Sequence, residues 1–233
     1  MSLSWKPVPA PDRAILHGHY VTLEPLDANR HSRDLWTAVR GHDEVWTWLA
    51  DGPYATEAEL HRALLEKEIS PAAVFFAIVP GASGRLHDAG LERGAAAGYA
   101  SFMRIEPAHG VVEVGNILLA PRLQRTAAAT EAMYLMASHV FDTLGYRRYE
   151  WKCNAENVPS RRAALRLGFS FEGIFRQHMV IKDRNRDTAW FAMLDCEWPA
   201  RKRAFEAWLD PANFDADGVQ RNRLEHQSGS TLS

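Results

Sequence analysis

The chain of 233 residues is 46% hydrophobic and 24% charged, a composition that can bury a sizeable core. Its formal net charge of −2 and its pI near 6.6 exclude the strongly basic surface typical of nucleic-acid-binding proteins. No stretch approaches the roughly 20 apolar residues of a membrane-spanning helix, and no apolar run follows a basic start. We therefore expect a soluble, cytoplasmic protein that binds neither nucleic acid nor membranes.

The first third of the chain predicts an arm, a strand and two helices. Proline and polar residues in 1–14 indicate a flexible N-terminal arm. The alternating run YVTLEPL (20–26) predicts a half-buried strand. One helix is predicted at 30–41, where it ends on a glycine, and another from Thr56, where Glu59 completes a capping box.

The middle of the chain predicts three strands. Apolar runs at 73–79 and 98–105 are joined by a glycine-rich segment, 80–97, that is unusually long for a hairpin loop. We expect this segment to be disordered. The next strand is predicted at 110–121, and Gly115 in its middle indicates a bulge or a close approach to the backbone.

The last part alternates helices and strands. A single apolar stripe predicts a long helix over 127–144, which a glycine stops. Beyond it we expect a strand at 149–155, a short helix at 158–168, paired strands in 169–195 about a turn at 183–186, and a helix at 199–210 that docks by its apolar face.

This order predicts one α/β (α+β) domain, with a mixed sheet flanked by helices and a C-terminal helical extension. We expect the domain to span 15–198, with a C-terminal helix and tail, 199–233, packed on it.

The cysteines and histidines indicate no metal or disulfide chemistry. Cys153 and Cys196 lie far apart and lack C-x-x-C spacing, so we expect reduced thiols. His17 and His19 form an H-x-H pair without a third ligand at a recognisable spacing, so we expect no metal. His139 is expected on a helix surface.

The sequence PRLQRTAAAT (121–130) joins a strand to a helix. Unpaired N–H groups and the helix dipole make such a junction an anion site, to which Arg122 and Arg125 can add contacts. Alanine there is favourable if the residues are helical, whereas left-handed geometry would cost roughly 1–2 kcal/mol per residue. Three successive alanines therefore predict helical geometry. An ordinary helix start is the alternative.

The segment 112–173 resembles the GNAT N-acetyltransferase family, and within it the ribosomal-protein N-terminal acetyltransferases. The family loop Q/R-x-x-G-x-G/A, whose amides hold the pyrophosphate of acetyl-CoA, is matched by Gln124, Ala127 and Ala129, with Ala127 in place of a glycine. The resemblance covers about 20–195. It continues in the segments Thr130-Glu131-Ala132, N-x-x-S (Asn157 to Ser160), Leu167-Gly168-Phe169 and Glu172-Gly173.

The resemblance implies transfer of an acetyl group from acetyl-CoA to a primary amine by direct attack in a ternary complex. Glu113 matches a general base of several relatives; its alternative reading is a solvent-facing strand residue. Ser160 matches a proton donor for the leaving thiolate; its alternatives are helix capping or a CoA contact. Many relatives use a tyrosine for that role, where this chain has Ala164.

The resemblance also implies the binding residues. The backbone of Ile117, Leu118 and Leu119 would pair with the pantetheine arm and thioester. The remaining CoA contacts would come from the residues Gln124, Arg125, Thr126, Ala127, Ala128, Ala129, Thr130 and Asn157. The acceptor pocket would contain Trp46, Trp48 and Tyr54, for which core packing is the alternative reading.

The implied acceptor is either a protein N-terminus or a small-molecule amine. Converging carboxylates would favour a polycation, and the candidates are Glu24, Asp43, Glu44 and Asp51. The family also makes a homodimer possible. A non-catalytic acyl-CoA-binding or regulatory domain is the alternative function, because Ala127 replaces a glycine and Ala164 a tyrosine.

Overall fold

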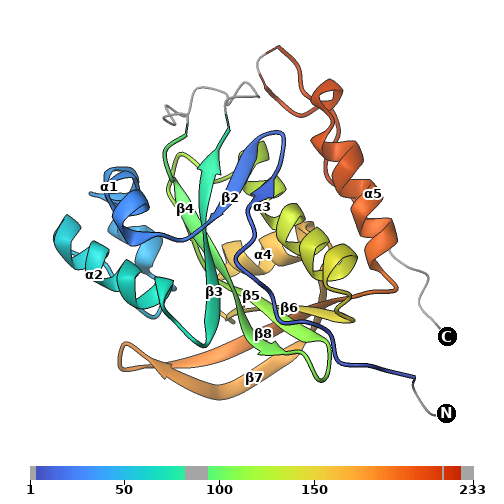
Figure 1. Ribbon diagram of the computed structural model, residues 1–233, viewed down its shortest axis with the longest axis horizontal. Helices are drawn as coiled ribbons and strands as arrows, with labels where there is room; N and C mark the ends of the chain where they lie inside the picture. Colours follow the sequence, from blue (N-terminus) through green and yellow to red (C-terminus); the bar gives the residue numbers. More distant parts are fainter. Residues whose placement is uncertain (1–3, 82–93, 217, 227–233) are drawn as a thin grey trace.

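The computed structural model describes residues 4–81, 94–216 and 218–226, and within them a mixed sheet of eight strands forms the centre (Figure 1). The spatial order is β1-β2-β3-β4-β5-β6-β8-β7, and only the pair β5–β6 is parallel. The strands are β1 (Leu16–His17), β2 (Val21–Pro25), β3 (Ala73–Pro80), β4 (Gly98–Glu106), β5 (Val111–Leu119), β6 (Arg148–Asn154), β7 (Ser170–Ile181) and β8 (Arg184–Leu194). The predicted mixed-sheet fold is therefore confirmed.

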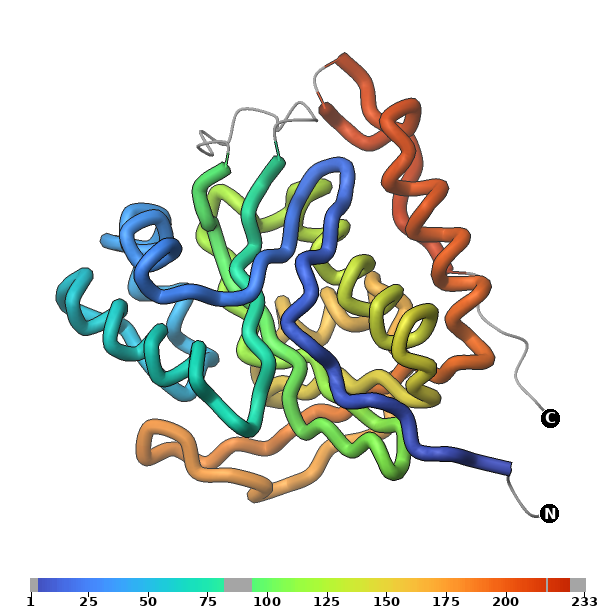
Figure 2. Tube along the Cα trace, in the orientation of Figure 1, coloured from blue at the N-terminus to red at the C-terminus, as the bar shows by residue number. Residues whose placement is uncertain are grey.

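Helices cover both faces of this sheet (Figures 1 and 2). One face carries α1 (Ala28–Val39) and α2 (Glu57–Glu68); the other carries α3 (Ala127–Ser138), α4 (Val158–Arg166) and α5 (Trp198–Leu209). Each face has its own apolar core. On β5, Val112 and Val114 face the α3 side, so the alternation of a strand turns Glu113 towards the α1–α2 side.

Capping residues fix the starts of the first two helices. Asp27 accepts a hydrogen bond from Arg30 N at the start of α1. Thr56 accepts one from Glu59 N, while the Glu59 carboxylate accepts one from Ala55 N. The predicted capping box is present, with its return bond one residue earlier than the usual pattern.

The predicted helix at 127–144 is present, but its last part is a π-helical segment, His139–Thr143. Gly145, at φ +75°, ends it. The prediction for His139 is wrong: its ring is 7% exposed and stacks on Phe102 at 6.1 Å. Burial lowers the pKa of His139, while Asp12 partly opposes the shift.

The N-terminal segment lies along the turn between β4 and β5. Trp5 Nε1 donates to Ala108 O at 2.8 Å, Val8 N donates to Pro107 O, and the Arg147 guanidinium lies over the Trp5 ring. The flexibility of the arm and the domain limits remain predictions.

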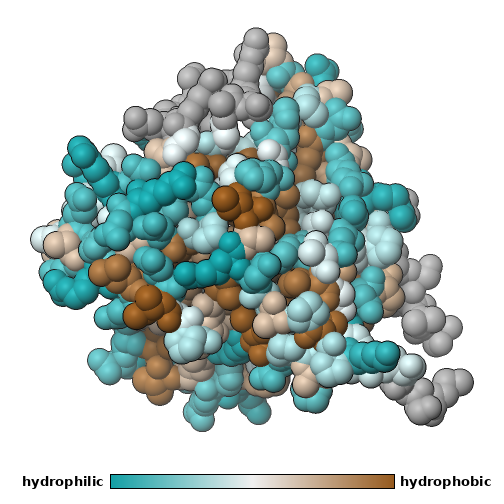
Figure 3. All heavy atoms as spheres, viewed as in Figure 1, coloured by the Kyte–Doolittle hydropathy of each residue, from teal (hydrophilic) through white to brown (hydrophobic). Residues whose placement is uncertain are grey.

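Most of the segment predicted to be disordered, 80–97, falls outside the described residues. None of the helices in the described ranges has the length and apolar character to span a membrane. The face seen in Figure 3 is largely hydrophilic, with apolar side chains in small separate patches.

Candidate active site

Strands β5 and β6 part in the middle of the sheet. Their parallel pairing runs from Val111 opposite Arg148 to Val114 opposite Trp151, and the described residues show no pairing beyond it. On the other side of β5 the register to β4 shifts around Asn116, whose φ is +50°. The bulge predicted at Gly115 is thus confirmed. Any side chain there would collide with Met103, whose sulfur lies 2.5 Å from an added Cβ.

A cleft of about 1520 Å³ opens beside this gap. Most of the predicted CoA-binding residues line it: Ile117, Leu119, Gln124, Arg125, Thr126, Ala127, Ala129 and Thr130. Three others do not contribute to its wall. Leu118 and Ala128 are buried in the core, and Asn157 lies at the start of α4.

The turn that enters α3 places its left-handed residue before the alanines. Arg125 has φ +63°, whereas Ala127 already begins the helix. Thr126 is the N-cap: its hydroxyl accepts from Ala129 N at 3.1 Å and donates to Leu123 O at 2.7 Å. The predicted helical geometry of the alanines is confirmed, and the φ that would favour glycine falls on residue 125 instead.

Two side chains expected to contact CoA have structural partners. Gln124 Nε2 donates to Leu119 O at 3.0 Å, at the end of β5. Asn157 caps α4, because its Oδ1 accepts from Ser160 N at 3.1 Å. The capping role weighed for Ser160 therefore belongs to Asn157.

Ser160 lies directly behind a residue of the cleft wall. Its hydroxyl oxygen accepts from Trp151 Nε1 at 3.0 Å, and Trp151 lines the cleft. Cys153 is close by: burial raises the pKa of its thiol, and a hydrogen bond with Ser160 partly opposes the shift.

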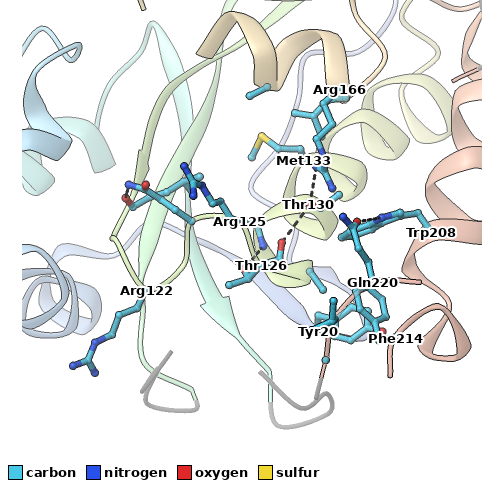
Figure 4. A pocket seen from close by; sticks show the side chains of 18 of the residues that line it. Tyr20, Arg122, Arg125, Thr126, Thr130, Met133, Arg166, Trp208, Phe214 and Gln220 are labelled. Carbon is cyan, nitrogen blue, oxygen red and sulfur yellow. Dashed lines mark hydrogen bonds between the residues drawn. The ribbon is translucent and has the colours of Figure 1, made fainter. Parts of the chain in front are cut away.

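Besides Arg122, three arginines give the cleft a cationic lining. Arg162 and Arg166 lie one turn apart on α4. Figure 4 shows Arg166 and Arg125, which comes from the turn before α3. Arg166 donates to Thr130 Oγ1 at 3.2 Å, and its guanidinium lies 4.9 Å from the ring centre of Trp208. No carboxylate of the described ranges forms an ion pair with any of the three.

Arg162 and Arg166 are not among the residues predicted for the site. Their i, i+4 spacing was the available signal, because it puts both side chains on one face of a helix. The spacing alone does not show that this face of α4 lies next to the start of α3.

Glu113 lies on the other side of the sheet, and its solvent-facing reading is excluded because it is 3% exposed. Its Oε2 lies 2.7 Å from Arg104 Nη1 and 3.0 Å from Lys152 Nζ. No hydrogen bond from a described residue reaches its Oε1. The carboxylate is therefore held at one oxygen, beside the bulge at Gly115.

Lys152 extends this ion pair into a network. Its side chain is 3% exposed, and Nζ also lies 2.7 Å from Glu150, the parallel neighbour of Glu113. Arg148 joins Glu150 to Glu172. Lys152 Nζ also lies 3.8 Å from the ring centre of Trp190, a cation–π contact that fixes it further.

The predicted acceptor residues divide between core and surface. Trp46 is 2% exposed and packs edge-on against Tyr54, so the core-packing reading holds for it. Trp48 is 38% exposed. The Tyr54 hydroxyl donates to Asp51, which also binds Lys67 Nζ at 2.6 Å.

Three of the four carboxylates considered for a polycation have basic partners, and Asp43 forms no ion pair with a described residue. Glu24 pairs with Arg30 and Glu44 with His42, and Asp51 has the partners described above. The tip of the β7–β8 hairpin closes this region, since Lys182 Nζ donates to Trp46 O and Asp51 O, both at 3.0 Å. Within the described chain no group of three or more ligand side chains is placed to hold a metal ion.

Comparisons with known proteins agree with this geometry. A model of the family described as "Acetyltransferase (GNAT) domain" matches residues 21–170. The ribosomal-protein-serine acetyltransferase of Escherichia coli K12 is 31% identical over 97 residues, which cover 42% of this chain and 54% of that protein. The chain thus spans about half the length of the curated relatives that it matches.

Two solved structures are similar over most of the chain. A GCN5-related N-acetyltransferase from Brucella melitensis is 51% identical, with a TM-score of 0.88 and coverage of 95% of this chain and 96% of that one. A protein of the GNAT family from Chromobacterium violaceum is 36% identical, with a TM-score of 0.76 and coverage of 86% and 96%. The cleft, the parted strands and these likenesses show that the chain belongs to the GNAT family of acetyltransferases, which use acetyl-CoA.

Proposed function

We propose that the chain transfers an acetyl group from acetyl-CoA to a primary amine by direct attack in a ternary complex. The observation that carries the proposal is the parting of β5 and β6 between a cationic cleft on one side and a held carboxylate on the other. A thioester that enters from the cleft meets an amine that enters from the Glu113 side. Such proximity supplies most of the catalysis that a direct transfer needs.

The cleft side suits acetyl-CoA. The first N–H groups of α3, at Ala127 and Ala128, have no partner within the helix and face the turn, where a diphosphate would bind. Arg125 adds positive charge. The edge of β5 at Ile117 and Leu119 has lost its parallel neighbour, so its peptide groups can pair with the pantetheine arm.

We assign the general base to Glu113. An ammonium ion must lose a proton before its nitrogen can attack, and the free Oε1 can take that proton directly or through water. The amine nitrogen then bonds to the thioester carbon, the C–S bond breaks, and CoA leaves as a thiolate. Ser160, whose oxygen accepts from Trp151 Nε1 and whose hydroxyl contacts Cys153, is the proposed proton donor to that thiolate. The second proton lost by the attacking nitrogen then restores the Ser160 hydroxyl.

A protein N-terminus is the acceptor that the structure favours. Three of the four carboxylates that would attract a polyamine or an aminoglycoside, Glu24, Glu44 and Asp51, are paired with basic side chains. The network around Glu113 places Arg104 and Lys152 on the acceptor side, and their positive charges would repel a polycation. The relative from E. coli, which is named a ribosomal-protein-serine acetyltransferase, also supports a protein acceptor. Trp48 and Tyr54 are proposed to border the entry, and a homodimer remains a prediction from the resemblance.

The test is thiol release from acetyl-CoA with a panel of peptides with free or blocked N-termini, a polyamine and an aminoglycoside. Glu113→Gln should lower kcat by about 10²–10⁴-fold, and the loss should shrink when the pH is raised and the amine deprotonates unaided. Glu156→Gln, an exposed carboxylate near α4, is the control and should not change kcat.

Acetyl-CoA that raises Tm while no amine releases thiol would instead favour the non-catalytic alternative.

A further inference from the structure

The C-terminal extension forms one wall of the cleft. The match to the family domain ends at residue 170, yet the cleft is also lined by residues that follow it: Trp208, Pro211, Phe214, Gly218, Val219 and Gln220. In Figure 4, Trp208, Phe214 and Gln220 stand together across from Thr126 and Thr130. This wall therefore lies outside the part of the chain that the family model matches.

Helix α5 packs against α3 and against the π-helical segment that follows it. Trp198 stacks on Phe141 at 5.3 Å and on Tyr134 at 6.1 Å, and its Nε1 donates to Asp142 at 2.8 Å. Phe205 is 1% exposed. A helix held by buried aromatic residues at one end can position a wall at its other end.

The segment after α5 folds back on itself. Asn213 is 6% exposed; its Nδ2 donates to Trp208 O at 2.9 Å, and its Oδ1 accepts from Asn222 N at 2.9 Å. Phe214 pairs with Gln220 in an isolated bridge, and Gln220 accepts from Trp208 Nε1 at 2.7 Å. These bonds give the wall a defined shape.

The wall is also joined to the other side of the cleft. The Tyr20 hydroxyl donates to Leu209 O at 3.1 Å, and the Tyr20 ring packs edge-on against Phe214 at 5.9 Å. The backbone N–H groups of His19, Tyr20 and Val21 all donate to the buried Glu131 carboxylate on α3. The extension, the β1–β2 turn and α3 thus form one connected rim.

The two walls differ in chemistry. The extension offers the aromatic ring of Phe214 and the side chain of Val219, which is 59% exposed although it is apolar. Arg162 and Arg166 on α4 offer unpaired positive charge. A ligand that fits both carries a flat, uncharged ring system close to a phosphate.

We propose that the extension binds the adenosine end of acetyl-CoA: Phe214 and Val219 contact the adenine, while Arg162 and Arg166 bind the ribose 3′-phosphate. This inference rests on the proposed function, because acetyl-CoA is the donor. It assigns contact with the adenine to Phe214 and Val219, which lie beyond the residues that the family model matches.

The test compares two acetyl donors in the full chain. Acetyl-CoA carries the nucleotide and S-acetylpantetheine does not. Val219→Asp places a carboxylate on the exposed wall, where it repels the phosphates of the nucleotide, and it should raise KM for acetyl-CoA about tenfold. KM for S-acetylpantetheine and kcat should not change. Val180→Asp, also at an exposed valine but on β7, is the control and should leave both KM values unchanged.

Equal changes in both KM values, or none for acetyl-CoA, would overturn the inference. Adenosine 3′,5′-bisphosphate gives a readout that does not depend on turnover. It should bind the unmodified chain in calorimetry and bind the Val219→Asp and Phe214→Ala variants about tenfold more weakly. Absence of binding to the unmodified chain would refute the nucleotide wall, whereas absence of thiol release with bound nucleotide would refute only the proposed transfer.

Discussion

Charge is arranged in opposite ways on the two sides of the sheet. On the α1–α2 side, Arg104 and Lys152 hold Glu113 at distances of 2.7 and 3.0 Å. On the α3–α4 side, Arg125, Arg162 and Arg166 line a cleft and have no carboxylate partner within the described residues. The cations on the first side fix the position of a carboxylate of the protein itself. The arginines on the second side are available to bind an anionic ligand. The two sides should therefore respond differently to the loss of a cation.

The largest effect is expected on the paired side. Lys152→Met leaves Glu113 and Glu150 buried next to each other, and it should lower the free energy of unfolding by about 3–5 kcal/mol. Urea denaturation at neutral pH measures the loss. The double variant Lys152→Met/Glu113→Gln should recover part of it, because one carboxylate then needs no partner. A single variant as stable as the unmodified chain would show that the network stabilises nothing.

The second effect concerns the surplus of positive charge near the cleft. Burial, together with Arg201 and Arg166, lowers the pKa of His226 from 6.5 to about 4. The unfolded chain then binds this proton more tightly than the folded one. The contribution of neutral His226 to the free energy of unfolding should be fully present above about pH 6.5. It should decrease towards pH 4, by up to about 1.4 kcal/mol per pH unit.

Denaturation curves between pH 4 and 7 test this for the unmodified chain and for His226→Phe. The phenylalanine keeps the ring contact with Phe205 and removes the titrating group. The pH slope should be smaller in the variant; an identical slope would assign the acid sensitivity to other groups.

A smaller effect is expected from the unpaired side. Arg162→Ala should change stability by less than about 0.5 kcal/mol, as is usual for an exposed residue, but should raise the Kd of acetyl-CoA about tenfold. Calorimetry at two salt concentrations measures this, and high salt should reduce the difference. Arg33→Ala, at an exposed arginine of α1, is the control. A Kd unaffected by Arg162→Ala would remove this arginine from the site.

The smallest effect concerns the missing glycine. Ala127 is already helical, so Ala127→Gly should cost about 0.5–1 kcal/mol of stability and bring no gain in affinity for acetyl-CoA. Thermal denaturation and calorimetry check the two parts. A clear gain in affinity would mean that the Ala127 methyl group obstructs the diphosphate.

Features set by local sequence could be predicted. The bulge at Gly115, the capping box at Thr56 and the helical alanines after Thr126 each follow from neighbouring residues, and the structure contains all three. The turn of the last hairpin was placed at 183–186, and it lies just before Arg184 instead, since a turn of two residues leaves little local signal.

Features set by distant contacts could not be predicted. The partners of Glu113 depend on the parallel register that brings β6 beside β5. His139 is buried because Phe102, from β4, packs on it. The C-terminal wall of the cleft depends on where α5 packs on α3. The spacing of apolar residues along α5 predicts a buried face but not the helix that this face contacts.

The bonds of Lys182 have a consequence for how the chain folds. They join the β7–β8 hairpin to carbonyl groups that lie 131 and 136 residues earlier. During synthesis, the Trp46–Asp51 segment therefore leaves the ribosome long before the lysine that secures it. Contacts so far apart in sequence slow folding, because the chain loses entropy in closing a long loop before the hydrogen bonds form. The acceptor side should accordingly be among the last regions of a newly made chain to acquire its native order.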